Sequence, residues 1–328
     1  MNKTILVTGG AGYIGSTLVH LLLSHSHKVI VLDNLSYGGE SLLNVWHNPN
    51  FTLIKGSITS ADLINDVFQK NKIDSVVHLA AIVGDPACAK QPDLARKVNL
   101  EGSLQLLEIS IKYGAERFIF ASTCSNYGKM KDPMTFVDEA SLLAPVSLYA
   151  ELKVQIEKFI LNDLKGKDNF CPTALRFATA YGVSPRMRFD LTVNEFTKEL
   201  ALGKELEVFG EQFWRPYCHV YDISRAVLMV LESYKDQVAF NVFNVGDSNE
   251  NYQKRMIVEE ITRVIPDPIV KYVKRNEDPR DYRVSFEKLQ NNLGFKITRK
   301  VPDGIKEVNQ VIKDKIILNP EDGKYKNI

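Results

Sequence analysis

The sequence predicts an α/β protein with a doubly wound parallel sheet and a smaller α/β subdomain toward the C-terminus. Apolar runs of strand length alternate with amphipathic, helix-like stretches through the first half of the chain. A glycine cluster directly follows the first apolar run, and an acidic residue ends the second. Strands that alternate with helices in this way form a parallel sheet that helices cover on both faces.

The predicted elements follow one another in the order strand, helix, strand. Apolar runs of strand length occupy residues 5–8, 29–33, 51–54, 75–79, 118–122 and 173–177, and helical patterns occupy residues 14–24, 94–112 and 148–164. After about residue 180 the pattern changes to helices over 191–202 and 257–264, an extended segment over 207–217 and a strand over 239–245. We therefore expect a first domain over residues 1–180 and a second over residues 181–318. Residues 219–246 are expected to return to the core of the first domain, and residues 319–328 to form a loosely held polar tail.

The overall composition excludes several classes of function. The formal net charge of the 328 residues is +1, so nothing favours nucleic acid as a partner. No apolar run approaches the roughly 20 residues that a membrane-spanning helix needs, and no secretory leader is visible. Four widely spaced cysteines without a C-x-x-C motif indicate reduced thiols in a cytoplasmic protein and no metal site.

The glycine-rich turn has the pattern of a phosphate-binding loop. Gly9, Gly12 and Gly15 lie three residues apart between the first strand and the first helix, with Tyr13 and Ile14 opening that helix. Glycine lets the backbone approach a pyrophosphate, and the helix N-terminus offers N–H groups to the anion. The alternative is a tight turn without a ligand. The complete strand–turn–helix–strand unit favours a Rossmann-type dinucleotide site and makes residues 1–180 the cofactor domain.

The acid at the end of the second strand bears on the choice of cofactor. Asp33 can accept hydrogen bonds from the adenosine ribose hydroxyls, and its charge would repel a 2′-phosphate. Asn34 follows it, and no arginine or lysine occurs over residues 33–37. The sequence therefore predicts NAD rather than NADP.

A tyrosine and a lysine at helical spacing form a candidate catalytic pair. Tyr149 and Lys153 stand at i and i+4 and would project from one helix face. The ammonium and a positively charged nicotinamide ring would lower the pKa of the tyrosine and make it a general base. Such pairs are common on solvated helix faces, but this one follows the fifth strand. That strand ends in a hydroxyl-rich turn over residues 122–128, which could orient a substrate or only bond the backbone.

Together these residues resemble the extended short-chain dehydrogenases, in particular the NAD-dependent sugar epimerase/dehydratase family. The resemblance covers nearly the whole chain. It is carried by residues 8–15, 78–81, Asn99, 122–128, the Tyr149/Lys153 pair, 175–177 and 215–222.

The resemblance implies roles for particular residues. Tyr149 would act as the base, Lys153 would bind the nicotinamide ribose, and Thr123 would be the catalytic hydroxyl. Further cofactor contacts are implied for the residues that follow the third and fourth strands and for the asparagine of the next helix: Ser57, Ile58, Leu79, Ala80, Ala81 and Asn99.

Four positions depart from the family pattern. Related dehydratases carry Asp-Glu after the catalytic threonine, where this chain has Cys124 and Ser125, so elimination of water is disfavoured. Ser57 stands where the family has an adenine-binding aspartate. Thr179 replaces a frequent asparagine and puts one diphosphate contact in doubt. Residues 184–194 also look like a subgroup that includes bacterial GDP-heptose 4-oxidoreductases.

Several polar residues in the second half are candidates for binding a nucleotide diphosphate. Guanidinium groups bind phosphate oxygens through two parallel hydrogen bonds. Arg215 and Arg280 match phosphate-binding arginines of the family, whereas the other arginines could be solvated surface residues. The substrate-binding candidates are Cys124, Ser125, Thr179, Arg186, Arg188, Asn194, Arg215 and Arg280.

The leading hypothesis is a nucleotide-sugar epimerase that acts by hydride transfer at C4, with a role in the synthesis of surface-polysaccharide sugars. The alternatives are a nucleotide-sugar (including GDP-heptose) 4-dehydrogenase or ketoreductase with net redox change, a dehydrogenase of an apolar alcohol, and a non-catalytic dinucleotide sensor. The cationic candidates disfavour an apolar pocket, and the retained Tyr/Lys pair disfavours a sensor. The resemblance also implies at least a homodimer, formed by the helices over 94–112 and 148–164. Its apolar contacts could come from Leu104, Leu107, Ile111, Ile156 and Ile160, although some of these must also face the sheet.

The first prediction concerns Asp33. Asp33→Ala should weaken NAD binding and narrow the preference for NAD over NADP, because the carboxylate that accepts the ribose hydroxyls and repels a 2′-phosphate is removed. Titration of both cofactors against both proteins measures this. Equal affinity of the unaltered protein for NAD and NADP would contradict the prediction.

Overall fold

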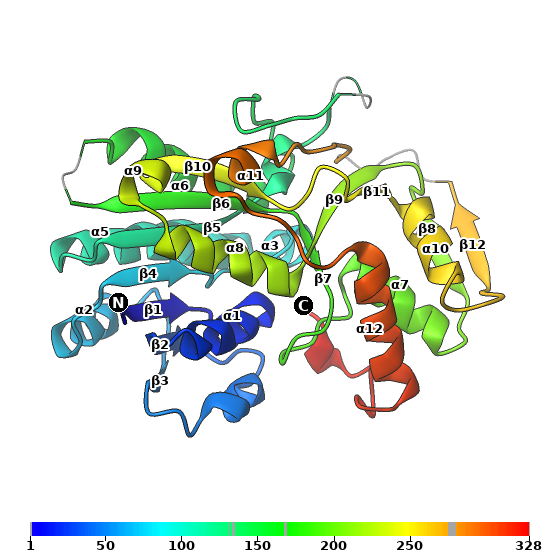
Figure 1. The fold of residues 1–328 in the computed structure, drawn as a ribbon, viewed down its shortest axis with the longest axis horizontal. Coiled ribbons are helices and arrows are strands. Elements are labelled where there is room, and N and C mark those ends of the chain that lie inside the picture. Colours follow the sequence, from blue (N-terminus) through cyan, green and yellow to red (C-terminus); the bar gives the residue numbers. More distant parts are fainter. Residues whose placement is uncertain (1, 131, 133–134, 167–168, 275–279, 328) are drawn as a thin grey trace.

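A seven-stranded parallel sheet forms the centre of the computed structural model, which describes residues 2–130, 132, 135–166, 169–274 and 280–327 (Figure 1). The strand order is β10-β6-β5-β4-β1-β2-β3, and all neighbouring strands pair in parallel. This arrangement confirms the predicted doubly wound sheet. The strands are β1 (Thr4–Thr8), β2 (Lys28–Asp33), β3 (Phe51–Lys55), β4 (Ser75–His78), β5 (Arg117–Thr123), β6 (Cys171–Phe177) and β10 (Asn241–Val245).

The sheet separates two apolar cores because successive side chains of a strand point to opposite faces. On β1, Ile5 and Val7 belong to one core and Leu6 belongs to the other, and all three are fully buried. The first core contains α1 (Tyr13–Ser24) and α8 (Val220–Glu232). The second contains α2 (Ala61–Lys70), α5 (Ser103–Lys112) and α6 (Leu148–Lys158). Both faces of the strands are therefore apolar, which explains their continuous hydrophobic runs.

A smaller part of the molecule packs around two further sheets. One has the order β11-β9-β7, and the other pairs β12 with β8. Since β7 follows β6 after a single residue, this part is joined directly to the carboxyl edge of the large sheet. Its elements are β7 (Thr179–Tyr181), α7 (Thr192–Ala201), β8 (Leu206–Phe209), β9 (Trp214–His219), β11 (Asn251–Gln253), α10 (Lys254–Thr262), β12 (Val270–Val273) and α12 (Val301–Lys313).

Short helices complete the connections between these elements. They are the α-helices α3 (Asp85–Lys90), α4 (Pro92–Arg96), α9 (Lys235–Val238) and α11 (Glu287–Leu293), the 3₁₀ helices η1 (Glu40–Val45), η3 (Cys124–Tyr127) and η5 (Gly323–Tyr325), and the π-helices η2 (Lys97–Gly102) and η4 (Phe159–Asp163). Within the described residues, no helix has the length and apolar character needed to cross a membrane.

The end of the chain is not the loosely held tail that the sequence led us to expect. Its described part, residues 319–327, packs against the loop before α7. The backbone N–H of Phe189 donates to the carbonyl of Tyr325 (2.8 Å), and their rings meet edge to face at 5.5 Å. The N–H of Asn327 donates to the carboxylate of Asp190 (3.0 Å). Figure 1 shows the red C-terminal segment returning to the boundary between the two parts of the molecule.

Three of the apolar residues expected at a dimer contact serve the core of their own chain. Leu107, Ile156 and Ile160 are fully buried in the second core, beneath the sheet. Only Leu104 and Ile111 are partly exposed. These three are therefore the residues of the set that face the sheet, which helical periodicity alone could not identify.

Candidate active site

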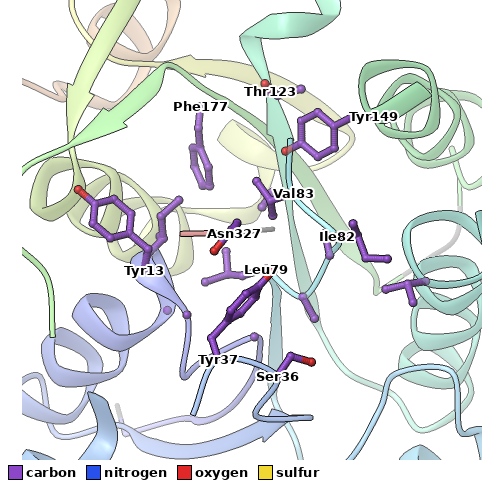
Figure 2. A pocket seen from close by; sticks show the side chains of 18 of the residues that line it. Tyr13, Ser36, Tyr37, Leu79, Ile82, Val83, Thr123, Tyr149, Phe177 and Asn327 are labelled. Atoms are coloured by element: carbon purple, nitrogen blue, oxygen red, sulfur yellow. The ribbon is translucent and has the colours of Figure 1, made fainter. Parts of the chain in front are cut away.

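A cleft of about 520 Å³ lies at the carboxyl ends of the parallel strands and is lined by residues from both parts of the molecule (Figure 2). Open α/β sheets bind ligands at this edge. Most of the predicted cofactor residues line the cleft: Gly9, Gly12, Tyr13, Ile14, Gly15, Asp33, Asn34, Ser57, Ile58, Leu79, Ala80, Ala81, Tyr149 and Lys153. The structure therefore brings together residues that are widely separated in the sequence.

The three glycines of the turn have different surroundings. A Cβ on Gly15 would lie 2.1 Å from the carbonyl oxygen of Gly9, and Gly9 itself has a φ of +74°. Both positions need glycine for the protein's own backbone packing. At Gly12, where φ is −76°, a Cβ would meet only the Gly9 oxygen, at 3.2 Å. Among the described residues no side chain caps α1, whose first residues line the cleft, so its first-turn N–H groups have no side-chain acceptor. An open glycine beside a helix N-terminus fits a diphosphate.

Asp33 is held in place by backbone hydrogen bonds. Its Oδ2 accepts from the N–H of Ala11 (2.9 Å), and its Oδ1 accepts from the N–H of Leu35 (2.8 Å). Burial raises the pKa of this carboxyl, and the two backbone donors oppose that shift. A carboxylate has about four acceptor sites, so the oriented group can still accept ribose hydroxyls.

Tyr149, Lys153 and Thr123 line the same end of the cleft. The side chain of Ser147 caps α6 by accepting from the N–H of Ala150 (3.3 Å) and so fixes the start of the helix that carries Tyr149. Thr123 ends β5, and its Oγ1 accepts from the N–H of Ser125 (3.1 Å). Figure 2 shows the Tyr149 ring beside Thr123, with its hydroxyl directed into the cavity.

The electrostatics of the pair differ from the expectation for Tyr149. Burial raises the pKa of the Tyr149 phenol above its ordinary value. The Lys153 ammonium donates to the carbonyl of Ala121 (2.7 Å) and lies 5.9 Å from the centre of the tyrosine ring. Burial also lowers the pKa of Lys153 to about 8. The protein's own residues therefore do not produce the predicted lowering of the Tyr149 pKa.

A buried polar network lies behind the catalytic strand end. Glu157, one turn after Lys153 on α6, forms an ion pair with Arg176 of β6 at 2.7 Å, and both side chains are nearly inaccessible. The hydroxyl of Ser122 donates to the same carboxylate, as does the side-chain amide of Asn126 (2.8 Å). The network thus ties α6 to β5, to β6 and to the turn after Thr123.

The arginine candidates are placed differently from one another. Arg186, Arg188 and Arg280 line the cleft, together with Thr179 and Ser125. Arg188 pairs with Asp190 at 2.7 Å. Arg280 pairs with Asp85 at 3.0 Å. Arg188 and Arg280 are thus held in position by ion pairs within the protein.

Four candidates lie outside the cleft lining, for different structural reasons. Asn99 is buried behind the wall, where its side chain bonds both backbone groups of Ile82. The thiol of Cys124 turns inward and donates to the Arg176 carbonyl (3.3 Å). Asn194 is fully buried and accepts from the N–H of Gly182 (2.9 Å), whereas Arg215 stacks on Tyr282, a residue of the cleft lining.

Other lining residues were not predicted from the sequence. Tyr37, Phe177 and Tyr282 contribute aromatic rings to the cleft, and Asn327 enters it from the C-terminal segment. Phe177 could have been found, because it ends a predicted strand. Tyr282 and Asn327 stand in polar segments without periodicity, so no sequence signal marked them.

The fold and the cleft define a dinucleotide-binding enzyme of the Rossmann type. Residues 5–246 match the model of the NAD-dependent epimerase/dehydratase family, and the chain belongs to this family, whose cofactor is NAD. It is 30% identical to a UDP-glucose 4-epimerase of Halalkalibacterium halodurans over 89% of this chain and 90% of that protein.

Solved structures agree with this assignment. A UDP-glucose 4-epimerase of Thermotoga maritima with UDP-glucose has 31% identity and a TM-score of 0.83, covering 95% of this chain and 99% of that one. A dTDP-glucose 4,6-dehydratase of Bacillus anthracis in complex with NAD has 26% identity and a TM-score of 0.84, covering 95% and 97%. The family therefore includes both epimerases and dehydratases.

The second prediction separates the two kinds of glycine. Gly12→Ala should preserve thermal stability but weaken NAD binding on the order of tenfold, because a methyl group worth about 1 kcal/mol or more of repulsion enters the ligand's space. Gly15→Ala should instead destabilise the fold by about 1–3 kcal/mol, because its Cβ overlaps the Gly9 backbone. Calorimetric titration and thermal unfolding measure the two effects. Unchanged NAD affinity in Gly12→Ala would refute the assignment of this turn.

Proposed function

We propose that this chain is a nucleotide-sugar epimerase that inverts the configuration at C4 of the sugar by reversible hydride transfer. The observation that carries the proposal is the convergence of Thr123, Tyr149 and Lys153 on one cleft with the glycine turn and Asp33. The epimerase names of the similar proteins support it. A place in the synthesis of surface-polysaccharide sugars is part of the same proposal.

Tyr149 is the proposed acid and base. When bound, NAD supplies a hydride acceptor and a positively charged ring. Because burial raises the pKa of the Tyr149 phenol, it needs a neighbouring positive charge to become a phenolate. The phenolate oxygen then removes the proton of a sugar hydroxyl and returns it to the epimer. Thr123, whose Oγ1 is oriented by the N–H of Ser125, aligns that hydroxyl.

Elimination of water is not part of the proposed reaction. A dehydratase needs an acid beside the leaving hydroxyl. Cys124 is buried, and burial raises the pKa of its thiol well above the ordinary value, so it is a poor proton donor. Ser125 lines the cleft but carries only a hydroxyl.

We propose that the protein binds its substrate through a nucleotide diphosphate group. Arg188 and Arg280 line the cleft and carry the charge that such a group requires. Their carboxylate partners, Asp190 and Asp85, hold them in place until a substrate competes for them. A net dehydrogenase or ketoreductase acting on a nucleotide sugar would use the same residues, and product analysis distinguishes it from an epimerase.

The third prediction tests the base. Tyr149→Phe removes one oxygen and should lower turnover on the order of the 10²–10⁴-fold that is typical of general-base removal, with NAD affinity and thermal stability retained. Thr123→Ala should lower turnover by a smaller factor, because water can replace the hydrogen bond of the threonine hydroxyl. Tyr234→Phe is a matched control, since this tyrosine is 79% exposed and lies outside the cleft. Near-normal turnover by Tyr149→Phe would remove the basis of the mechanism.

The fourth prediction concerns assembly. We propose that the chain forms at least a homodimer through the surface of α5 and α6, with Leu104 and Ile111 among the contacts because they keep exposed area. Sedimentation should show a species of twice the chain mass. A monomer that persists at every concentration would contradict this proposal.

A further inference from the structure

The C-terminal segment and one arginine together form a wall of the cleft. Arg186 is 6% exposed, and its guanidinium lies 4.4 Å from the centre of the Tyr37 ring. The same group donates from Nη2 to the carbonyls of Lys326 (3.3 Å) and Lys324 (3.5 Å). Arg186, Tyr37 and Asn327 all line the cleft, and Figure 2 shows Asn327 projecting into it.

This wall carries one donor and one acceptor without partners. Within the described residues, Nε of Arg186 and Oδ1 of Asn327 are both buried and make no hydrogen bond. A buried polar atom left in this state costs about 1–3 kcal/mol, and such atoms are rare in native proteins. Because both residues face the same cleft, a ligand that offers an acceptor and a donor would satisfy them together.

The charge of the wall identifies the kind of ligand. In the described part of the chain, no carboxylate lies within ion-pair distance of Arg186, whereas the neighbouring Arg188 is paired with Asp190. The backbone N–H of Arg186 contacts Ser16 of α1 (3.4 Å), so the arginine stands beside the helix that begins at the glycine turn. A helix N-terminus and a cation without a counter-ion both favour an anion.

We propose that Arg186 and Asn327 bind the ribose-diphosphate portion of NAD, so that the C-terminal segment is part of the cofactor site. Nε of Arg186 donates to a phosphate oxygen, and Oδ1 of Asn327 accepts from a ribose hydroxyl. The carbonyls of Lys324 and Lys326 orient the guanidinium from behind. The inference rests on the assignment of NAD to the glycine-turn side of the cleft in the proposed function.

Calorimetric titration of the cofactor-stripped protein tests this inference. Arg186→Gln should bind NAD and ADP-ribose about 10- to 100-fold more weakly, as expected for a charge-assisted hydrogen bond, and should bind adenosine unchanged. Asn327→Ala should bind NAD about 2- to 10-fold more weakly, as expected for a neutral bond. Arg263→Gln is the matched control, because that arginine is 71% exposed and pairs only with Glu260 among the described residues.

Shortening the chain after Asp322 gives an independent test of the segment. This variant should lose NAD affinity by at least as much as Asn327→Ala. If the shortened chain unfolds without nucleotide, the two point variants alone test the role of the segment, because neither removes the contact between Phe189 and Tyr325. Unchanged NAD affinity in both point variants would overturn the inference. Tighter NAD binding by the shortened chain would also overturn it, as would point variants that lose affinity only for NADP or for a uridine nucleotide.

The outcome separates this inference from the proposed function. If the unaltered protein binds no NAD, the proposed function fails. If it binds NAD and epimerises its substrate while the Arg186 and Asn327 variants bind NAD equally well, only the role of the segment fails.

Discussion

The buried ion pair between Glu157 and Arg176 fixes the positions of the proposed catalytic residues relative to one another. Removing one member of such a pair costs about 3–5 kcal/mol because an uncompensated charge remains in the interior. Glu157 lies one helical turn beyond Lys153, and the same carboxylate accepts from Ser122, the neighbour of Thr123. The geometry of the tyrosine, the lysine and the threonine therefore depends on a contact that faces away from the cleft.

Burial then sets the electrostatic state of the residues that this network positions. It raises the pKa of Tyr149, which keeps the phenol protonated near neutral pH, and it lowers the pKa of Lys153 to about 8. A positive charge brought beside Tyr149 would shift it toward the phenolate. In the proposed mechanism, Tyr149 becomes a base only when the cofactor site is occupied. Without the positive charge of the bound cofactor, the buried phenol stays protonated.

Local patterns were sufficient to predict the sheet and much of the cleft. The glycine turn, Asp33 and the Tyr149/Lys153 pair each follow from short-range spacing, and the parallel sheet brings strand ends together at one edge. Features that depend on distant contacts could not be predicted. Cys124 faces inward at the start of η3, where its thiol donates to the carbonyl of Arg176, and Arg215 stacks on Tyr282, which lies far from it in the sequence.

The C-terminal segment is the clearest example of this limit. Its polar composition indicated a loose tail, yet Tyr325 packs on Phe189 and Asn327 enters the cleft. Helix α6 illustrates the same problem for apolar residues, since Ile156 is buried against the sheet and unavailable to a second subunit. In both cases the partner surface is far away in the sequence, so no local pattern shows it.

The most direct test of the central claim is the product formed from a panel of UDP-, GDP-, dTDP- and CDP-sugars. Product NMR identifies the sugar, and the absorbance of reduced nicotinamide reports net redox change in the same sample. We predict a C4 epimer from at least one nucleotide sugar, without accumulation of reduced nicotinamide. A 4-keto-6-deoxy sugar, a stoichiometric rise in reduced nicotinamide, or no conversion of any member of the panel would contradict it.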